Sequence, residues 1–279
     1  MAPGGRRRRP DLCQGFPEFT GSAPIRVRWG HGRVRRAARL TRVFTFRRPK
    51  VRLEVPRLKP RGEAVQLPRV NLAELTPALL PYLGQAAYIQ LSLFESLSRI
   101  VTQAPTVAHK ESLGPAAGQA LDKHERLVAE IRRHVDDPAV IMQPFAAAID
   151  AYREVVAGST WSEALTSLYV SAGILDDFFI HLAAGLENGS GPRMVQILDA
   201  ETGRQAIATI LADNIAADPR LASQLAMWGR RVVGDTLLVA RSAIHHTDNR
   251  NSDEQRIEPV FTEVIASHTR RMDGLGLTA

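Results

Sequence analysis

The sequence has a single cysteine among its 279 residues, Cys13, so no disulfide can form within the chain. One cysteine also excludes zinc and iron–sulfur sites that are built from several thiolates. The chain lacks the glycine-rich phosphate loop, the dinucleotide-binding glycine pattern and the Gly-x-Ser-x-Gly turn that carries a serine nucleophile. The sequence therefore offers no local signature of nucleotide binding or of serine catalysis.

Long apolar runs are also missing. No segment reaches the roughly 18 uninterrupted apolar residues that a membrane span needs. The four arginines Arg6 to Arg9 resemble the start of an export signal, but Pro10 and Asp11 follow where an apolar stretch would be required. We expect a soluble, cytoplasmic protein with no membrane partner.

Positive charge is concentrated at one end of the chain. Residues 1–70 hold 19 of the 36 basic residues and 4 of the 29 acids, a net charge of +15, so residues 71–279 carry 17 basic and 25 acidic residues, a net charge of −8. A leader so rich in arginine and proline is expected to be disordered. It could bind RNA or another nucleic acid through its charge. It could equally be an upstream sequence translated from too early a start.

From residue 71 onward, apolar residues recur every three or four positions, which is typical of amphipathic helices. Proline and glycine breaks divide this region into seven predicted helices, and no strand pattern follows residue 70. We predict an all-α domain over 71–279, an antiparallel four-helix bundle with extra C-terminal helices. The predicted helices span about 73–103, 109–134, 138–157, 161–186, 193–216, 220–245 and 254–272.

Two of these helices have marked starts. Asp137 before Pro138 begins the helix over 138–157. Ser159 or Thr160 caps the helix over 161–186, with Glu163 as the capping-box acid. The helix over 161–186 is apolar nearly all round, so we expect it to be the most buried element of the fold.

Four of the predicted helices carry a polar residue in the middle of an apolar stripe. Isolated polar groups at such positions would be costly to bury, but four at similar depth can satisfy one another. Carboxylate-bridged di-metal bundles have this layout, with a Glu-x-x-His pair on two of the helices. The residues are Gln90, His124, Asp176 or Asp177, and Glu201 with Arg204.

The body resembles the ferritin-like superfamily, and within it actinobacterial proteins similar to the MiaE tRNA hydroxylases. The resemblance covers about 71–275 and rests on short motifs in a given order, which are Ala87–Ser92, Lys123–Leu127, Tyr169–Phe178, Glu201–Arg204, Leu225–Arg231 and His268–Met272. It implies a non-haem di-iron centre that activates oxygen. The MiaE enzymes hydroxylate an isopentenyl-type modified adenosine in tRNA.

The resemblance also implies six metal-ligand positions. Three keep a residue that can donate to a metal, namely His124, Glu201 and Asp177, or Asp176 beside it. At the other three positions, Gln90 replaces a glutamate, Leu121 replaces a carboxylate and Arg204 replaces a histidine. A protonated guanidinium has no lone pair to offer. We therefore expect no metal cofactor, with di-iron as the alternative.

These substitutions predict a ferritin-like protein with a degenerate di-iron site and a structural, binding or regulatory role; the alternative is an active tRNA hydroxylase. We expect Arg204 to pair with Glu201 or Asp177 and to supply the charge that iron would have brought. Replacing Arg204 by alanine should then lower the free energy of unfolding by about 3–5 kcal/mol. Three simpler interpretations remain: Gln90 bonding a neighbouring helix, His124 as a satisfied core histidine, and Glu201 pairing with Arg204 at the surface. The domain could form a homodimer, as ferritin-like bundles often do.

Overall fold

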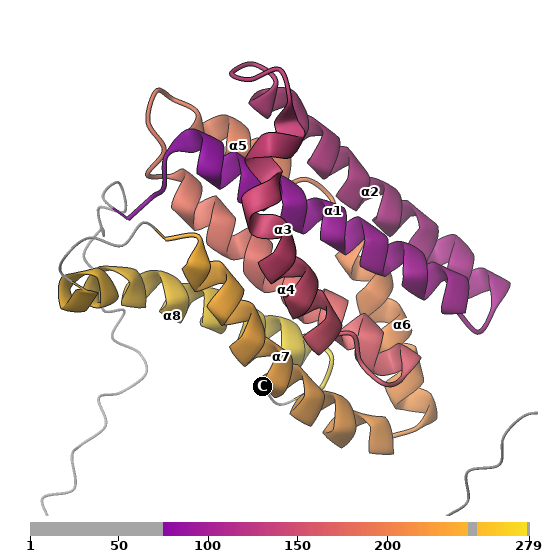
Figure 1. Ribbon diagram of the computed structural model, residues 1–279. Helices are drawn as coiled ribbons and strands as arrows, with labels where there is room; N and C mark the ends of the chain where they lie inside the picture. Colours follow the sequence, from indigo (N-terminus) through magenta and orange to yellow (C-terminus); the bar gives the residue numbers. More distant parts are fainter. Residues whose placement is uncertain (1–74, 245–249, 278–279) are drawn as a thin grey trace, which may run out of the picture. The chain divides into compact units, whose positions relative to one another are not determined.

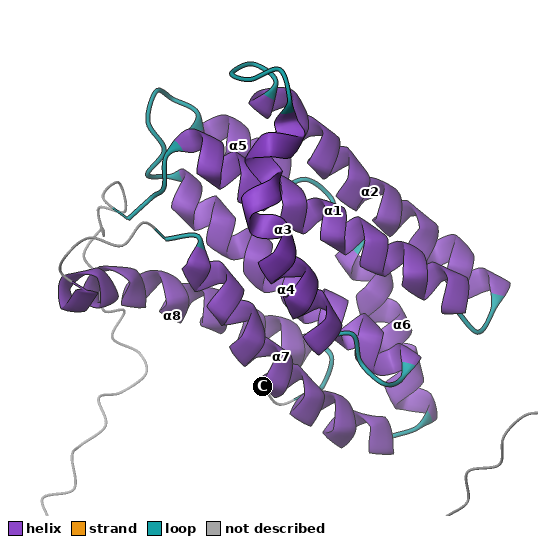
Figure 2. Ribbon diagram, viewed as in Figure 1, coloured by secondary structure: helices purple, strands orange, loops and turns teal. Residues whose placement is uncertain are grey.

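A computed structural model describes residues 75–244 and 250–277. Every regular element within these ranges is a helix, and there are eight of them, as Figure 2 shows. The all-α fold that the sequence predicts is therefore confirmed. The predictions about the leader over residues 1–70, including its disorder and its binding of nucleic acid, lie outside the described residues.

Four helices form the bundle that holds the site described below. These are α1 (Leu79–Gln103), α2 (Val107–Ile131), α4 (Trp161–Ala183) and α6 (Arg204–Ala217). Helices α1 and α2 are joined by only three residues and lie side by side as an antiparallel pair (Figure 1). Helix α4 packs against α1 and α6, and α6 in turn reaches α2, which closes the ring of four.

The remaining helices cover this bundle. They are α3 (Pro138–Val155), α5 (Gly191–Leu198), α7 (Arg220–Ser242) and α8 (Arg250–Gly274). Helix α3 packs on α1, while α7 and α8 pack on α4. The first helix is predicted to begin at about residue 73 but begins at Leu79. A start at 73 would need amide donors at positions 77 and 81, and both are proline, which has none.

Helix α4 is the centre of the core, as its continuous apolar sequence predicts. Its side chains at Leu165, Val170, Ile174 and Phe178 have no exposed surface. By length and composition α4 could cross a membrane, but most of it is buried among the other helices. A buried core helix meets the same criteria, so this burial is consistent with a soluble domain.

The entry to α4 is fixed by a reciprocal cap. The Thr160 hydroxyl accepts from the Glu163 amide at 3.2 Å, and the Glu163 carboxylate accepts from the amides of Thr160 and Ser159. This capping box confirms the prediction that Ser159 or Thr160 begins the helix with Glu163 in the first turn.

One predicted helix is wrong. The sequence pattern favours a single helix over 193–216, but the structure divides it into α5 and α6, with residues 199–203 between them. Gly203 has φ of +62°, a left-handed conformation that favours glycine, and a side chain there would collide with Ala116 of α2. The break brings the start of α6 close against α2.

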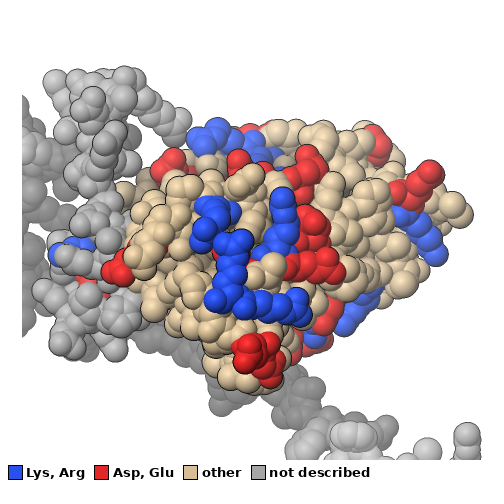
Figure 3. Space-filling view, turned by 90° about the horizontal axis from the view of Figure 1, so that it is seen from above, with Lys and Arg blue, Asp and Glu red and all other residues tan. Residues whose placement is uncertain are grey.

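Charges on the helical body are distributed in pairs. Basic and acidic side chains lie next to one another on the face seen in Figure 3. Measured pairs include Arg126 with Asp122 at 3.7 Å, and Arg133 and Arg193 with Glu130 at 3.6 and 3.5 Å. Each of these pairs neutralises its own charges locally, and the net negative charge of the body remains.

Candidate functional site

The most buried charges of the described chain meet at Asp176, in the middle of α4. The Asp176 side chain is 3% exposed. Gln90 of α1 donates from Nε2 to Asp176 Oδ1 at 2.8 Å, and Lys123 of α2 donates from Nζ to Asp176 Oδ2 at 3.1 Å. Both carboxylate oxygens are therefore satisfied from neighbouring helices, which lowers the cost of burying the charge.

Lys123 is the cation of this cluster. Its side chain is 1% exposed, an unusual degree of burial for lysine. Besides Asp176, Nζ donates to the carbonyl oxygen of Leu198, the last residue of α5. The lysine therefore ties α2 to α4 and also to the end of α5, whose terminal carbonyls have no partner within their own helix.

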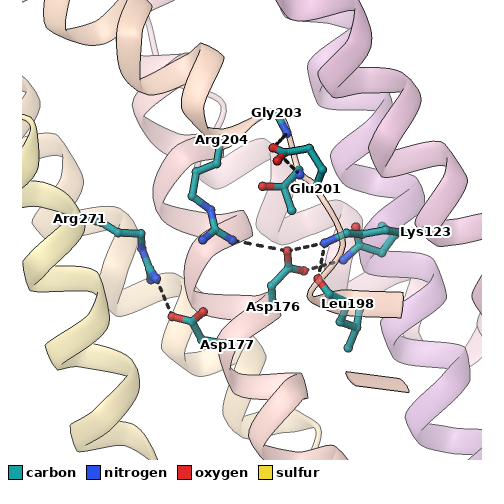
Figure 4. Close-up of polar contacts among 10 residues, drawn as sticks. Lys123, Asp176, Asp177, Leu198, Glu201, Gly203, Arg204 and Arg271 are labelled. Carbon is teal, nitrogen blue, oxygen red and sulfur yellow. Dashed lines mark hydrogen bonds and ion pairs between the residues drawn. The ribbon is translucent and has the colours of Figure 1, made fainter. Parts of the chain in front are cut away.

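Arg204 approaches Asp176 from the opposite side to Lys123, as Figure 4 shows. Its Nη2 lies 3.8 Å from Asp176 Oδ2, too far for a hydrogen bond, and its side chain is 32% exposed. The prediction that Arg204 pairs with Glu201 or Asp177 is thus wrong. Asp177 points away and accepts from Arg271 Nη1 of α8 at 2.6 Å.

Glu201 lies in the α5–α6 connection rather than on a helix. Its Oε1 accepts from the amides of Thr202 and Gly203, both at 3.1 Å, immediately before α6. A carboxylate at this position compensates free amides and the positive end of the helix dipole. Glu201 therefore stabilises the turn that precedes α6, and no ion pair between Glu201 and Arg204 is seen among the described contacts.

His124 and Leu121 lie at the edge of the core of α2. Both are half-buried. His124 Nδ1 is 2.9 Å from the carbonyl oxygen of Ala87 in α1, a contact in which Nδ1 must carry the proton. The expected meeting of Gln90, His124 and Glu201 is therefore wrong, since each has a different partner.

The charges of the cluster act on two nearby tyrosines. Burial, and then the Asp176 charge, raise the pKa of Tyr82, whose hydroxyl donates to the Phe179 carbonyl at 2.8 Å. Burial also raises the pKa of Tyr169, an effect that Arg271 and Arg204 oppose. Both guanidinium groups thus lie close to Tyr169.

An open hollow of about 440 Å³ lies beside Asp176, bounded by α4, α6, α8 and the α5–α6 connection. We call it the carboxylate pocket. Its charged lining residues are Asp176, Asp177, Asp199, Glu201, Arg204 and Arg271. Lys123 lies behind Asp176, so the three cations around the pocket face four carboxylates, and each of Asp176, Asp177 and Glu201 already has a partner within the protein.

Comparison with known proteins agrees with this architecture. The model of a family described as the ferritin-like domain of actinomycetes matches residues 75–251, more than half of the chain. The chain belongs to this ferritin-like family. No curated protein matches it.

The ferritin-like fold implies a metal, so the donor residues of this domain decide whether one fits. A di-metal site in a bundle needs several carboxylates and imidazoles that point to one interior place. Within residues 75–244 and 250–277, no three His, Cys, Asp or Glu side chains gather closely enough to hold an ion. Asp176 faces Lys123 and Arg204 instead. The donor set does not fit a di-iron centre.

The sequence prediction for this ferritin-like domain missed Lys123. The buried residues of α2 include Leu113, Ala116, Ala120, Leu127 and Ile131, and position 123 lies on the same stripe. The resemblance points instead to the neighbouring His124, as the histidine of an i, i+3 pair with position 121. The spacing of three and four residues from Ala120 and Leu127 was the available signal. For Asp176 and Asp177, the spacing of apolar residues cannot tell which of the two faces the core, because α4 is buried nearly all round.

Proposed function

We propose that this ferritin-like domain works without a metal, in a structural, binding or regulatory role, and that its di-iron site is degenerate. The observation that carries the proposal is the buried Lys123 ammonium on Asp176. A cation fixed there compensates the carboxylate as a metal would, and it would repel an incoming metal ion. Gln90 supports this arrangement because its neutral amide donates to Asp176.

The residue that supplies the positive charge differs from the sequence-based expectation, which is Arg204. Lys123 is the fully buried cation and makes a direct hydrogen bond, whereas Arg204 is one-third exposed and 3.8 Å away. The charge that replaces a metal is therefore assigned mainly to Lys123. Arg204 adds a weaker, partly screened attraction.

Metal analysis of the purified full chain tests the proposal. The protein is incubated with ferrous iron without oxygen, passed through a desalting column and analysed for bound iron. We expect no stoichiometric iron, and a melting temperature that neither iron nor chelator changes. The double variant His124→Ala/Glu201→Ala is the matched control, because it removes two of the remaining donors. Stoichiometric iron in the wild type that is lost in this variant would contradict the proposal.

The alternative is the hydroxylase activity that the resemblance to MiaE implies. It requires iron, since oxygen is not activated by the amino-acid side chains themselves. The iron-treated protein is incubated with a reductant, oxygen and tRNA that carries an isopentenyl-modified adenosine. A mass gain of one oxygen atom on that nucleoside would establish the alternative. We also propose a cytoplasmic location and homodimer formation, which fractionation and light scattering would examine.

A further inference from the structure

A second hollow lies away from Asp176, between the C-terminal half of α1, the end of α3 and the first turns of α4. It has a volume of about 240 Å³ and a lining that is largely apolar. We call it the serine cavity, because Ser92 and Ser96 of α1 and Ser167 and Ser171 of α4 line it. Each pair is spaced four residues apart, which puts both hydroxyls on one helix face.

The hydroxyls of α4 are held in place by other side chains. Ser167 Oγ accepts from Trp228 Nε1 at 2.8 Å, so its own proton remains to be donated. Ser171 Oγ is 2.6 Å from the Tyr152 hydroxyl, which also lies 2.7 Å from Thr236 Oγ1. These contacts fix the polar wall before any ligand enters.

The charged groups of the serine cavity are all basic. Arg99 and Arg153 line it, and no aspartate or glutamate does. Arg153 is already paired with three carboxylates, those of Glu95, Asp150 and Glu154, the last of which lies 3.8 Å from Nε. Arg99 is exposed at the rim, and no ion pair is seen for it within the described ranges. The cavity therefore offers the Arg99 guanidinium and the Ser167 hydroxyl next to an apolar wall.

We propose that the serine cavity binds a small amphipathic carboxylate, with its carboxylate at the Arg99 end and its apolar chain against the apolar wall. Ligand sites are typically apolar hollows with a few fixed polar groups. The size of the ligand is estimated from the cavity volume. A cavity of about 150 Å³ accepts benzene, which has six non-hydrogen atoms. In the same proportion, the serine cavity of about 240 Å³ holds about ten. Octanoate has that size and serves as the probe.

Calorimetric titration of the full chain with octanoate, and with octanol as its uncharged counterpart, tests the proposal. We expect octanoate to bind at one site about threefold more tightly than octanol, because the Arg99 guanidinium attracts the carboxylate but is exposed, so that solvent screens the pair. Arg99→Gln should reduce the octanoate affinity about threefold and leave octanol unchanged. Arg126→Gln, an exposed arginine of α2 outside the cavity, is the matched control.

A second variant tests the apolar part of the cavity. Ser96→Leu puts a larger side chain into the hollow and should abolish binding of both ligands, whereas Ser223→Leu on the exposed side of α7 should not. Far-UV circular dichroism of each variant establishes that it is folded. Absence of octanoate binding to the wild type, equal affinity for octanol, or undiminished binding by a folded Ser96→Leu variant would overturn the proposal.

Discussion

The carboxylate pocket and the serine cavity are both lined by residues of α4, but they differ in the charges that line them. At the carboxylate pocket, buried and half-buried charges of both signs satisfy one another. At the serine cavity, hydroxyls and guanidinium groups line an apolar hollow with no carboxylate among them. The charged groups of the carboxylate pocket are satisfied within the protein, whereas the serine cavity leaves the Arg99 guanidinium and the Ser167 proton for a ligand. We infer that the first supports the fold and the second supports binding.

The largest expected effect is at Lys123. Lys123→Met leaves the buried Asp176 without its cation and should lower the free energy of unfolding by about 3–5 kcal/mol. The double variant Lys123→Met/Asp176→Leu should recover most of that loss, because it removes both charges together. Urea denaturation of both proteins measures the difference. A loss below about 1 kcal/mol in the single variant would show that the pair contributes little to the fold.

The next largest effect is at Gly203, which brings the start of α6 to the carboxylate pocket. Gly203→Ala should cost about 2 kcal/mol or more, because φ is +62° and a Cβ would lie 2.2 Å from Ala116 Cβ. Gly118→Ala in α2 is the matched control, since that position has open space and alanine favours helix. The control should be neutral or stabilising in the same denaturation experiment.

A smaller, pH-dependent effect is expected at His268 of α8, near the Asp177–Arg271 pair. Burial and the nearby Arg271 lower the pKa of His268 from 6.5 to about 4, while Asp177 opposes the shift. The unfolded chain therefore binds this proton first as the pH falls. Stability from this residue is complete above pH 6.5 and decreases as the pH falls toward 4. His268→Gln should flatten that part of the stability curve measured by denaturation.

Arg204→Ala should have a still smaller effect, about 1 kcal/mol or less. The sequence alone predicts a strong loss for this change, but the guanidinium is one-third exposed and 3.8 Å from Asp176. Solvent screens such a pair. A loss of 3 kcal/mol in thermal or urea denaturation would restore Arg204 as the main cation of the cluster and reduce the role assigned to Lys123.

The smallest effect on stability is expected in the serine cavity. Ser96→Leu should change the free energy of unfolding by about 0.5 kcal/mol or less, because it fills a hollow at a half-buried position and breaks no measured contact. The same change should abolish octanoate binding. A strong destabilisation would instead give this region a structural role like that of the carboxylate pocket.

Several features were determined by the sequence alone. The recurrence of apolar residues from position 71 predicts the all-α body, since helical period and core burial are local properties. Thr160 with Glu163, and Asp137 before Pro138, mark helix starts that the structure confirms. The continuous apolar character of α4 predicts its place in the core. The single cysteine excludes a disulfide without reference to any structure.

Only the tertiary structure decided which polar side chains meet. Asp176 and Asp177 are neighbours in sequence, but helix geometry directs one to Lys123 and the other to Arg271. The serine cavity depends on how α1, α3 and α4 pack, and four serines in sequence do not reveal it. Pairing between distant residues is set by helix rotation and packing, because a rotation by one residue, about 100°, exchanges a buried side chain for an exposed one.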